Sequence, residues 1–327
     1  MSEITFKSHK VTCHPDETLL DALLREKIDV QFGCKAGSCH TCLMKSADQP
    51  PPAKAQEGLK PTQKQQKYFL ACICKPEQDM TVSPANDSEQ FITKATVLEK
   101  QPLNDDVIQL KLKCHDSISF KPGQFVNLKK PDGLSRSYSV ANTPNEDNIL
   151  EFHIRSLPGG QFSQWAKNEL EVGEQIPVSE PKGDCFYIPE RQNQGLLLIG
   201  TGTGLAPLLG IIKDALAQQH SGPIHLLHGS RNKKGLYHID EMKTLAEQYP
   251  NFHYTACVSG EMPEKDFEQG RVNEIALNKI NDLKGWRVYL CGHPEMVNDT
   301  KKQAFLKGAS MQDIFSDPFL VTQNEEK

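Results

Sequence analysis

Three cysteines on one short segment restrict how this 327-residue chain can fold. Cys34, Cys39 and Cys42 follow one another with the spacing C-x4-C-x2-C. Three thiolates on one loop can share a compact centre only if the loop doubles back tightly. Gly33 and Gly37 permit that turn and let backbone N–H groups approach the sulfurs. The spacing is typical of a [2Fe–2S] cluster, whereas structural zinc sites usually pair cysteines two residues apart.

A fourth thiolate has to come from elsewhere in the chain. Cys72 and Cys74 stand beyond a polar segment, and the residues alone leave both open. His40 lies inside the loop and is predicted to face solvent rather than to bind iron, because enough cysteines are available. The scattered cysteines are predicted to pack in cores, and these are Cys13, Cys114, Cys185 and Cys257.

Charge and apolar content exclude some classes of protein. The 37 basic and 42 acidic residues give a net charge of −5, which argues against sequence-blind nucleic-acid binding. Apolar runs stay well short of the roughly 20 residues that span a bilayer, and the first residues lack a signal-peptide core. We therefore expect no nucleic-acid partner, no membrane span and a cytoplasmic location, where thiols stay reduced.

The first segment alternates short elements with polar connections. Alternation over residues 3–13 predicts a β-hairpin, and Asp16 is predicted to cap a helix over residues 19–24. Residues 49–67 are predicted to be too polar to form a core, and residues 68–72 restore a strand-like run.

Two further segments follow a linker predicted at residues 83–88. Between residues 91 and 188, short alternating stretches divided by Pro and Gly predict a small antiparallel barrel. After residue 194, apolar strands alternate with helices, which predicts a parallel sheet covered on both faces. The predicted strands are residues 196–199, 224–227, 252–258 and 286–290.

A glycine loop follows the first of these strands. Its residues are Gly200, Thr201, Gly202, Thr203 and Gly204, and a helix over residues 208–216 comes next, with Pro207 in its first turn. Such a loop lets a pyrophosphate approach the free N–H groups of the helix N-terminus. Cys291 and Gly292 end a later strand, and the carboxyl ends of parallel strands are where such sheets bind ligands.

The middle segment carries residues suited to a flat, phosphorylated ligand. Arg136 can hold a phosphate, while Tyr138 and Ser139 can place a ring and a hydroxyl against a heterocycle. Residues 159–163 offer N–H donors near a helix start.

Two resemblances join these motifs. Residues 1–82 resemble a plant-type ferredoxin domain of β-grasp fold, in which a Leu-x-Cys run holds the last ligand, and this implies Cys72 with Cys34, Cys39 and Cys42. Residues 91–188 and 194–319 resemble the ferredoxin–NADP reductase superfamily. That resemblance implies FAD, favoured over FMN because the ferredoxin comes first.

The superfamily resemblance also implies roles for single residues. Arg136 would bind the flavin phosphate, and Tyr138 and Ser139 the isoalloxazine. The diphosphate side would be bound by Ile154, Arg155, Gly160, Gln161 and Ser163. Cys291 and Gly292 would lie beside the nicotinamide, with Cys291 orienting hydride transfer rather than acting as a nucleophile.

The C-terminal run over residues 314–319 resembles the tail of oxygenase reductases that approaches the flavin. Phe319 and Asp317 are candidates for that role, or Phe315 and Phe319 anchor the tail in the core. NADPH-using relatives commonly carry a Ser-Arg pair where this chain has residues 259–261, Ser-Gly-Glu, which favours NADH. The basic run at residues 230–234 keeps NADPH as the alternative.

The expected protein is multidomain α+β and α/β: a ferredoxin domain at 1–84, an antiparallel β-barrel flavin domain at 91–190 and a nicotinamide domain at 194–327. It would pass electrons from NADH through FAD and the cluster to a partner protein, the oxygenase of a multicomponent system. The alternative partner is a deoxysugar dehydratase or another reductive enzyme. A third reading, a non-enzymatic scaffold with zinc-binding cysteines, predicts a colourless protein.

Overall fold

The computed structural model describes residues 1–85, 90–260 and 266–320. The chain divides into two compact units, residues 1–88 and 89–327. Part of the predicted linker, residues 86–88, lies outside the described residues, and so does Glu261.

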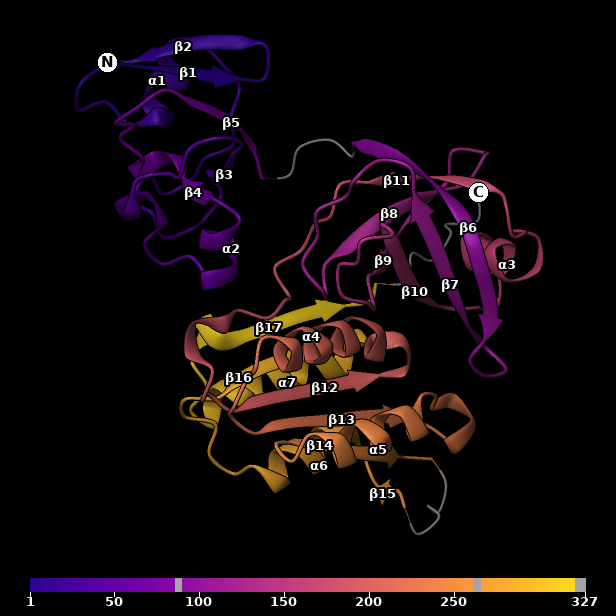
Figure 1. The fold of residues 1–327 in the computed structure, drawn as a ribbon. Coiled ribbons are helices and arrows are strands. Elements are labelled where there is room, and N and C mark those ends of the chain that lie inside the picture. Colours follow the sequence, from indigo (N-terminus) through magenta and orange to yellow (C-terminus); the bar gives the residue numbers. More distant parts are fainter. Residues whose placement is uncertain (86–89, 261–265, 321–327) are drawn as a thin grey trace. The chain divides into compact units, whose positions relative to one another are not determined.

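The first unit is a mixed five-stranded sheet against which helix α1 packs (Figure 1). Its central strands β1 and β5 are parallel, and the other neighbours pair antiparallel. This is the expected β-grasp arrangement. In sheet order the strands are β2 (His9–Cys13), β1 (Ser2–Phe6), β5 (Met80–Pro84), β3 (Leu43–Ser46) and β4 (Tyr68–Leu70), and the helix is α1 (Leu19–Arg25).

Two local predictions for this unit were wrong. The cap of α1 is Thr18, whose hydroxyl accepts from Asp21 N–H, while Asp16 sits in a turn with φ +67°. The polar connection also contributes to the core. It folds into a 3₁₀ helix (Ala53–Gln56) and helix α2 (Pro61–Gln65), and both Ala55 and Leu59 are completely buried. This mostly polar segment thus adds two apolar side chains to the core of the unit.

The second unit begins with a six-stranded antiparallel sheet, as predicted for the flavin segment. Ala141 N–H, just after β9, donates to Glu151 O on β10, so the first and last strands of the ladder approach each other. In sheet order the strands are β10 (Ile149–Arg155), β7 (Val107–Cys114), β6 (Phe91–Pro102), β11 (Gln175–Ser179), β8 (Phe125–Lys129) and β9 (Ser135–Ser139), followed in the chain after β10 by helix α3 (Gln161–Asn168).

The rest of this unit is the expected parallel sheet with helices on both faces (Figure 1). In sheet order its strands are β15 (Glu268–Gln269), β14 (Phe252–Val258), β13 (Ile224–Ser230), β12 (Leu196–Thr201), β16 (Arg287–Gly292) and β17 (Ile314–Pro318). Its helices are α4 (Leu205–Ala217), α5 (Ile239–Gln248), α6 (Val272–Lys279) and α7 (Pro294–Leu306).

Alternate residues of β12 serve the two faces of this sheet. Leu196 and Leu198 pack in one core with α4 and Met242 of α5, whereas Leu197 and Ile199 pack in another with α6 and α7. The strand is therefore apolar throughout because both of its faces are covered. Helix α4 begins at Leu205, three residues before the predicted start.

The scattered cysteines are in cores, as predicted, since Cys13, Cys114, Cys185 and Cys257 are all buried. Among the helices of the described residues, none combines the length and apolar character needed to cross a membrane.

Candidate functional site

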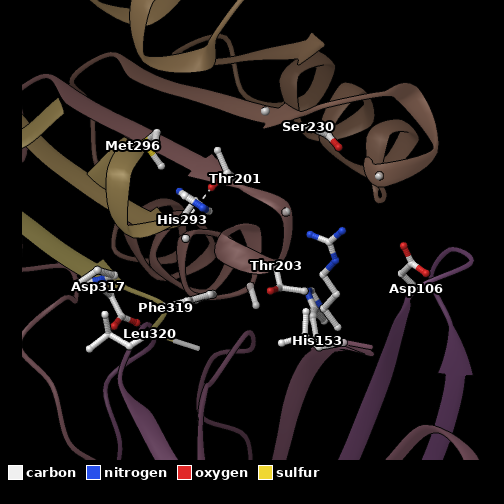
Figure 2. Close-up of a pocket in the computed structure, with 18 of the residues that line it drawn as sticks. Asp106, His153, Thr201, Thr203, Ser230, His293, Met296, Asp317, Phe319 and Leu320 are labelled. Carbon is white, nitrogen blue, oxygen red and sulfur yellow. Dashed lines mark hydrogen bonds between the residues drawn. The ribbon is translucent and has the colours of Figure 1, made fainter. Parts of the chain in front are cut away.

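A cleft of about 2040 Å³ lies between the antiparallel sheet and the carboxyl ends of the parallel strands (Figure 2). Figure 2 shows Thr201 and Ser230 at the ends of two parallel strands, with His153 on the opposite wall. Asp317 and Phe319 close one end from the tail. The fold thus brings the predicted flavin and nicotinamide residues to one cavity.

Strand β9 supplies one wall of the cleft. Arg136, Tyr138 and Ser139 all line it. The Tyr138 ring lies 5.2 Å from the Phe162 ring, tilted by 42°, which fixes the orientation of the tyrosine. Burial raises the pKa of Tyr138, so its hydroxyl stays protonated at neutral pH. A neutral aromatic ring beside a guanidinium suits a flat heterocycle that carries phosphate.

The turn before α3 forms the next part of the wall. Gly160 is the N-cap residue of α3, and the Ser163 hydroxyl accepts from Leu157 N–H at 3.2 Å. A Cβ on Gly160 would lie 2.4 Å from Ser163 Oγ, so a larger residue there would displace that hydroxyl. Arg155, at the end of β10, is exposed to the cleft beside Gln161. The arrangement presents N–H groups and a cation to the same space, as an anion requires.

The glycine loop and the Cys-Gly pair meet across the sheet. Thr201 Oγ1 accepts from His293 N–H at 2.9 Å, and Gly292 adopts φ +119°. A Cβ on Gly204 would lie 2.2 Å from the carbonyl oxygen of Cys291. His228 also holds the loop, because its Nε2–H donates to Gly202 O at 3.1 Å. The two motifs therefore form one surface, lined by Thr201, Gly202, Thr203 and Gly292.

Four predicted residues lie behind the wall of the cleft rather than on it. Ile154 and Cys291 have no exposed side-chain surface, and Gly200 and Gly204 are buried. Cys291 Sγ lies 3.9 Å from Cys185 Sγ, and burial raises its pKa well above the usual value. Cys291 is thus a neutral thiol one residue from the cleft, and its influence on hydride transfer stays a prediction.

The tail is continuous with the cleft. Strand β17 pairs in parallel with β16, and Phe319 N–H donates to Gly292 O at 2.8 Å. Ser139 Oγ donates to Asp317 Oδ2 at 3.0 Å, which joins the tail to β9. Phe315 is fully buried in the core, whereas Phe319 is half-buried and lines the cleft. Phe315 therefore anchors the tail in the core, and the approach of Phe319 to the flavin stays a prediction.

Basic residues gather at the far end of the cleft. Arg231, Lys234 and Arg271 line it together with Ser259 and Gly260. The Gly260 N–H donates to Arg231 O at 2.7 Å, so these two loops are in contact. Arg231 and Lys234 belong to the basic run that follows β13, whereas Arg271 precedes α6.

The cysteine loop of the first unit has the donor pattern expected around thiolates. Cys34 Sγ accepts from the N–H groups of Ala36, Ser38 and Cys39, each at 3.4 Å. N–H from Cys34 and the donors of Thr41 lower the pKa of Cys39 to about 6. Such hydrogen bonds stabilise negative charge on sulfur.

The two remaining predicted ligands lie deeper. Cys42 is 3% and Cys72 6% exposed. Burial, with the adjacent Cys72 thiol, raises the pKa of Cys42 to about 11. Cys74 is completely buried, and burial with the charge of Cys13 raises its pKa to about 12. Cys72 and Cys42 thus lie together, while the surroundings of Cys74 are those of a core thiol.

Several residues of the cleft escaped the sequence analysis. Asp106 and His153 line it, and His228 supports it from behind. Glu151 and His153 alternate on one strand, which was the available signal that both point to one side.

Three family models match successive parts of the chain. The 2Fe-2S iron-sulfur cluster binding domain matches residues 3–77. The oxidoreductase FAD-binding domain matches residues 94–187, and the oxidoreductase NAD-binding domain matches residues 198–302.

Similar proteins match over nearly the whole length. The aromatic O-demethylase reductase subunit of an Amycolatopsis species is 32% identical over 90% of this chain and 91% of that protein. The phenol hydroxylase P5 protein of Acinetobacter pittii is 30% identical over 96% of this chain and 95% of that protein. The crystal structure of the Amycolatopsis cytochrome P450 reductase GcoB has a TM-score of 0.69 and 31% identity, and covers 98% of this chain and 99% of that one.

Proposed function

Because this chain belongs to the family that joins a plant-type ferredoxin domain to a ferredoxin–NAD(P) reductase module, we propose that it carries electrons from NADH to a partner oxygenase. The chain is an NAD(P)H-dependent oxidoreductase with FAD, nicotinamide and [2Fe–2S] domains. The proposed domain bounds are residues 1–84, 91–190 and 194–327.

The observation that carries the proposal is the shared cleft. It holds Arg136 and Tyr138 on one wall and Thr201 and Gly292 on the other, so a flavin and a nicotinamide bound to these walls would face each other. When bound, the flavin supplies the conversion between a two-electron hydride donor and a one-electron iron–sulfur acceptor.

The chain's own part is to bind, orient and exclude water. Arg136 and the N–H groups at Gly160 would neutralise flavin phosphates, while Tyr138 and Ser139 would hold the ring. Phe319 would cover the ring at the tail end. Cys291 would position the backbone of Gly292 from behind. In the first unit, Cys34, Cys39, Cys42 and Cys72 would hold the cluster, with N–H donors that stabilise thiolate charge.

Coenzyme choice is proposed to favour NADH. The loop after β14 lacks an arginine next to Ser259. Arg231 and Lys234 line the same end of the cleft and could bind the ribose phosphate of NADPH, which keeps NADPH as the weaker alternative.

The proposed partner is an oxygenase component, because two similar proteins carry the names aromatic O-demethylase reductase subunit and phenol hydroxylase P5 protein. A cytoplasmic location is proposed as well, since the cluster thiols have to stay reduced before iron binds.

The test is an anaerobic NADH titration of the purified protein, followed by its visible spectrum, with iron, sulfide and flavin quantified. Flavin and cluster bands should both bleach with NADH, and with NADPH only at much higher concentration. A colourless protein after anaerobic reconstitution would contradict the proposal.

The same titration of two cysteine variants assigns the fourth ligand. Cys72→Ser should lose the cluster bands and most iron, while its flavin still bleaches with NADH. Cys74→Ser is the matched control, because it removes a neighbouring buried thiol, and it should keep both cofactors. Loss of the cluster in Cys74→Ser alone would reverse the assignment.

A further inference from the structure

A second group of side chains lies at the contact between the antiparallel and parallel sheets, apart from the proposed electron path. Glu151 and His153 are two residues apart on β10 and so project from the same face of that strand. His238 caps α5 on the other side. One potential ligand atom from each of the three lies within 4.8 Å of the other two.

The Nδ1 atom of each imidazole bonds a neighbouring side chain. His238 Nδ1 bonds Glu241 Oε2 at 2.7 Å, and His153 Nδ1 bonds the Tyr237 hydroxyl at 3.1 Å. Histidines that bind metals almost always make such a bond with the nitrogen that does not face the metal. These bonds fix the orientation of each ring and therefore the position of its Nε2 atom.

The second nitrogen of His238 is the unpaired atom of the cluster within the described part of the chain. His238 Nε2 is buried and has no hydrogen-bond partner among the described residues. Leaving a buried polar atom without a partner destabilises a folded protein, so its retention calls for a ligand. His153 Nε2 lies 3.1 Å from Glu151 Oε1, which places a second nitrogen and a carboxylate oxygen in the same cluster.

The charge state of the cluster suits a cation. Burial lowers the pKa of His153, so its imidazole is neutral at pH 7. Burial opposes ionisation of Glu151, but hydrogen bonds from His153 and Gln109 outweigh it and lower the pKa of that carboxyl. A neutral imidazole and an ionised carboxylate are the forms that bind metal. Lys213, 2.9 Å from Glu241 Oε1, faces the outer carboxylate.

We propose that Glu151, His153 and His238 form a binding site for a divalent transition-metal ion of the zinc class, which ties β10 to the N-terminus of α5. Two imidazoles and one carboxylate are a common ligand set for zinc. His153 lies at the wall of the cleft with its side chain buried, and the three residues would supply three of the metal ligands (Figure 2). The site does not rest on the proposed electron path, because none of Glu151, His153 and His238 is assigned to the flavin or the nicotinamide.

The test measures zinc uptake by the full-length holoprotein. The protein is dialysed anaerobically against zinc buffered by a chelator, and zinc, iron and flavin are quantified. Parent protein should bind one zinc ion per chain with its iron content unchanged. His115→Gln is the matched control, since His115 is an exposed histidine of the same antiparallel sheet region, and it should bind zinc like the parent.

Three variants distinguish the proposed ligands from Glu241, which only holds the His238 ring in place. His238→Gln and Glu151→Gln should weaken zinc binding by more than about 100-fold, and Glu241→Gln by about 10–100-fold. Iron and flavin contents verify that each variant is folded. Zinc should also raise the Tm of the parent but not of His238→Gln.

Two results would overturn the site. One is a parent protein that binds no zinc, in which case the cluster is only a set of hydrogen bonds between the two sheets. The other is zinc uptake that is equal in His238→Gln, or that occurs only as iron is lost, since the metal would then occupy cysteine sites.

Discussion

At the scale of single residues, the cleft depends on atoms that it does not expose. The Cys291 and Cys185 sulfurs pack against each other behind the surface formed by the glycine loop and Gly292. Both thiols are buried in the same core, so they lend themselves to a paired comparison.

Cys291→Ala should slow NADH-driven flavin reduction roughly tenfold or more, because a small displacement of the adjacent backbone misaligns the reacting groups. Cys185→Ala is the control, since it removes a neighbouring sulfur from the same core. Anaerobic stopped-flow absorbance of flavin reduction gives the rates. Equal rates in the two variants, with equal losses of stability, would mean that Cys291 serves packing alone.

Arg231→Ala should lower kcat/KM for NADPH roughly tenfold or more and leave NADH almost unchanged, because only NADPH carries an additional ribose 2′-phosphate that this guanidinium could bind. Initial rates of ferricyanide reduction with each coenzyme measure this. Lys233→Ala is the control, since Lys233 lies over the Phe267 ring and does not line the cleft. An unchanged NADPH efficiency in Arg231→Ala would make this arginine a solvated turn residue.

At the scale of elements, strand β17 joins the tail to two sheets. It extends the parallel sheet beside β16, and Asp317 accepts from Ser139 on β9. The carboxyl is held between the sheets, and burial raises its pKa to about 6, with the charge of Asp184 acting in the same direction and the Ser139 hydrogen bond opposing it.

This shift predicts a pH dependence of stability. The folded-state pKa of Asp317, about 6, exceeds the unfolded value of about 3.9, so the folded state binds its proton more tightly. The resulting stabilisation is complete below about pH 4 and is lost as pH rises through 6. Asp317→Asn cannot ionise, so its Tm relative to the parent should be several degrees higher at pH 8 than at pH 4.5. Calorimetry at both pH values measures the difference.

A Tm difference that is the same at both pH values would show that Asp317 titrates normally. Ser139→Ala provides a further check, because removing the hydroxyl that stabilises the carboxylate should raise the pKa of Asp317 and move the transition to higher pH.

At the scale of the whole molecule, the two units have separate cores. The core of the first unit is made only of residues between Ile4 and Val82, and the cores of the second unit begin after residue 94. We therefore expect each unit to fold without the other.

A fragment of residues 89–327 should fold, bind flavin and reduce ferricyanide with NADH within about twofold of the full chain, because the cleft lies within it. It should lose cluster absorbance and most cytochrome c reduction, which is expected to need a one-electron donor. Spectra and steady-state rates measure both. A fragment that is insoluble or free of flavin would show that the first unit is needed for folding.

Local patterns in the sequence determined much of this protein. The cysteine spacing identified the cluster segment, and the change from alternating to fully apolar strands separated the antiparallel sheet from the parallel one. These features are readable because each depends on residues close together in the chain. The glycine loop was recognisable for the same reason, since strand, loop and helix follow one another.

Only the tertiary structure decided what depends on distant contacts. Ala55 and Leu59 belong to a core although their segment is polar, and Cys291 lies behind the cleft rather than on it. The bond between Ser139 and Asp317 joins residues 178 positions apart, and Glu151, His153 and His238 meet across two sheets. No local sequence pattern predicts these contacts. They form when helices and strands from distant parts of the chain pack their apolar faces together, which brings the polar residues at their ends into contact.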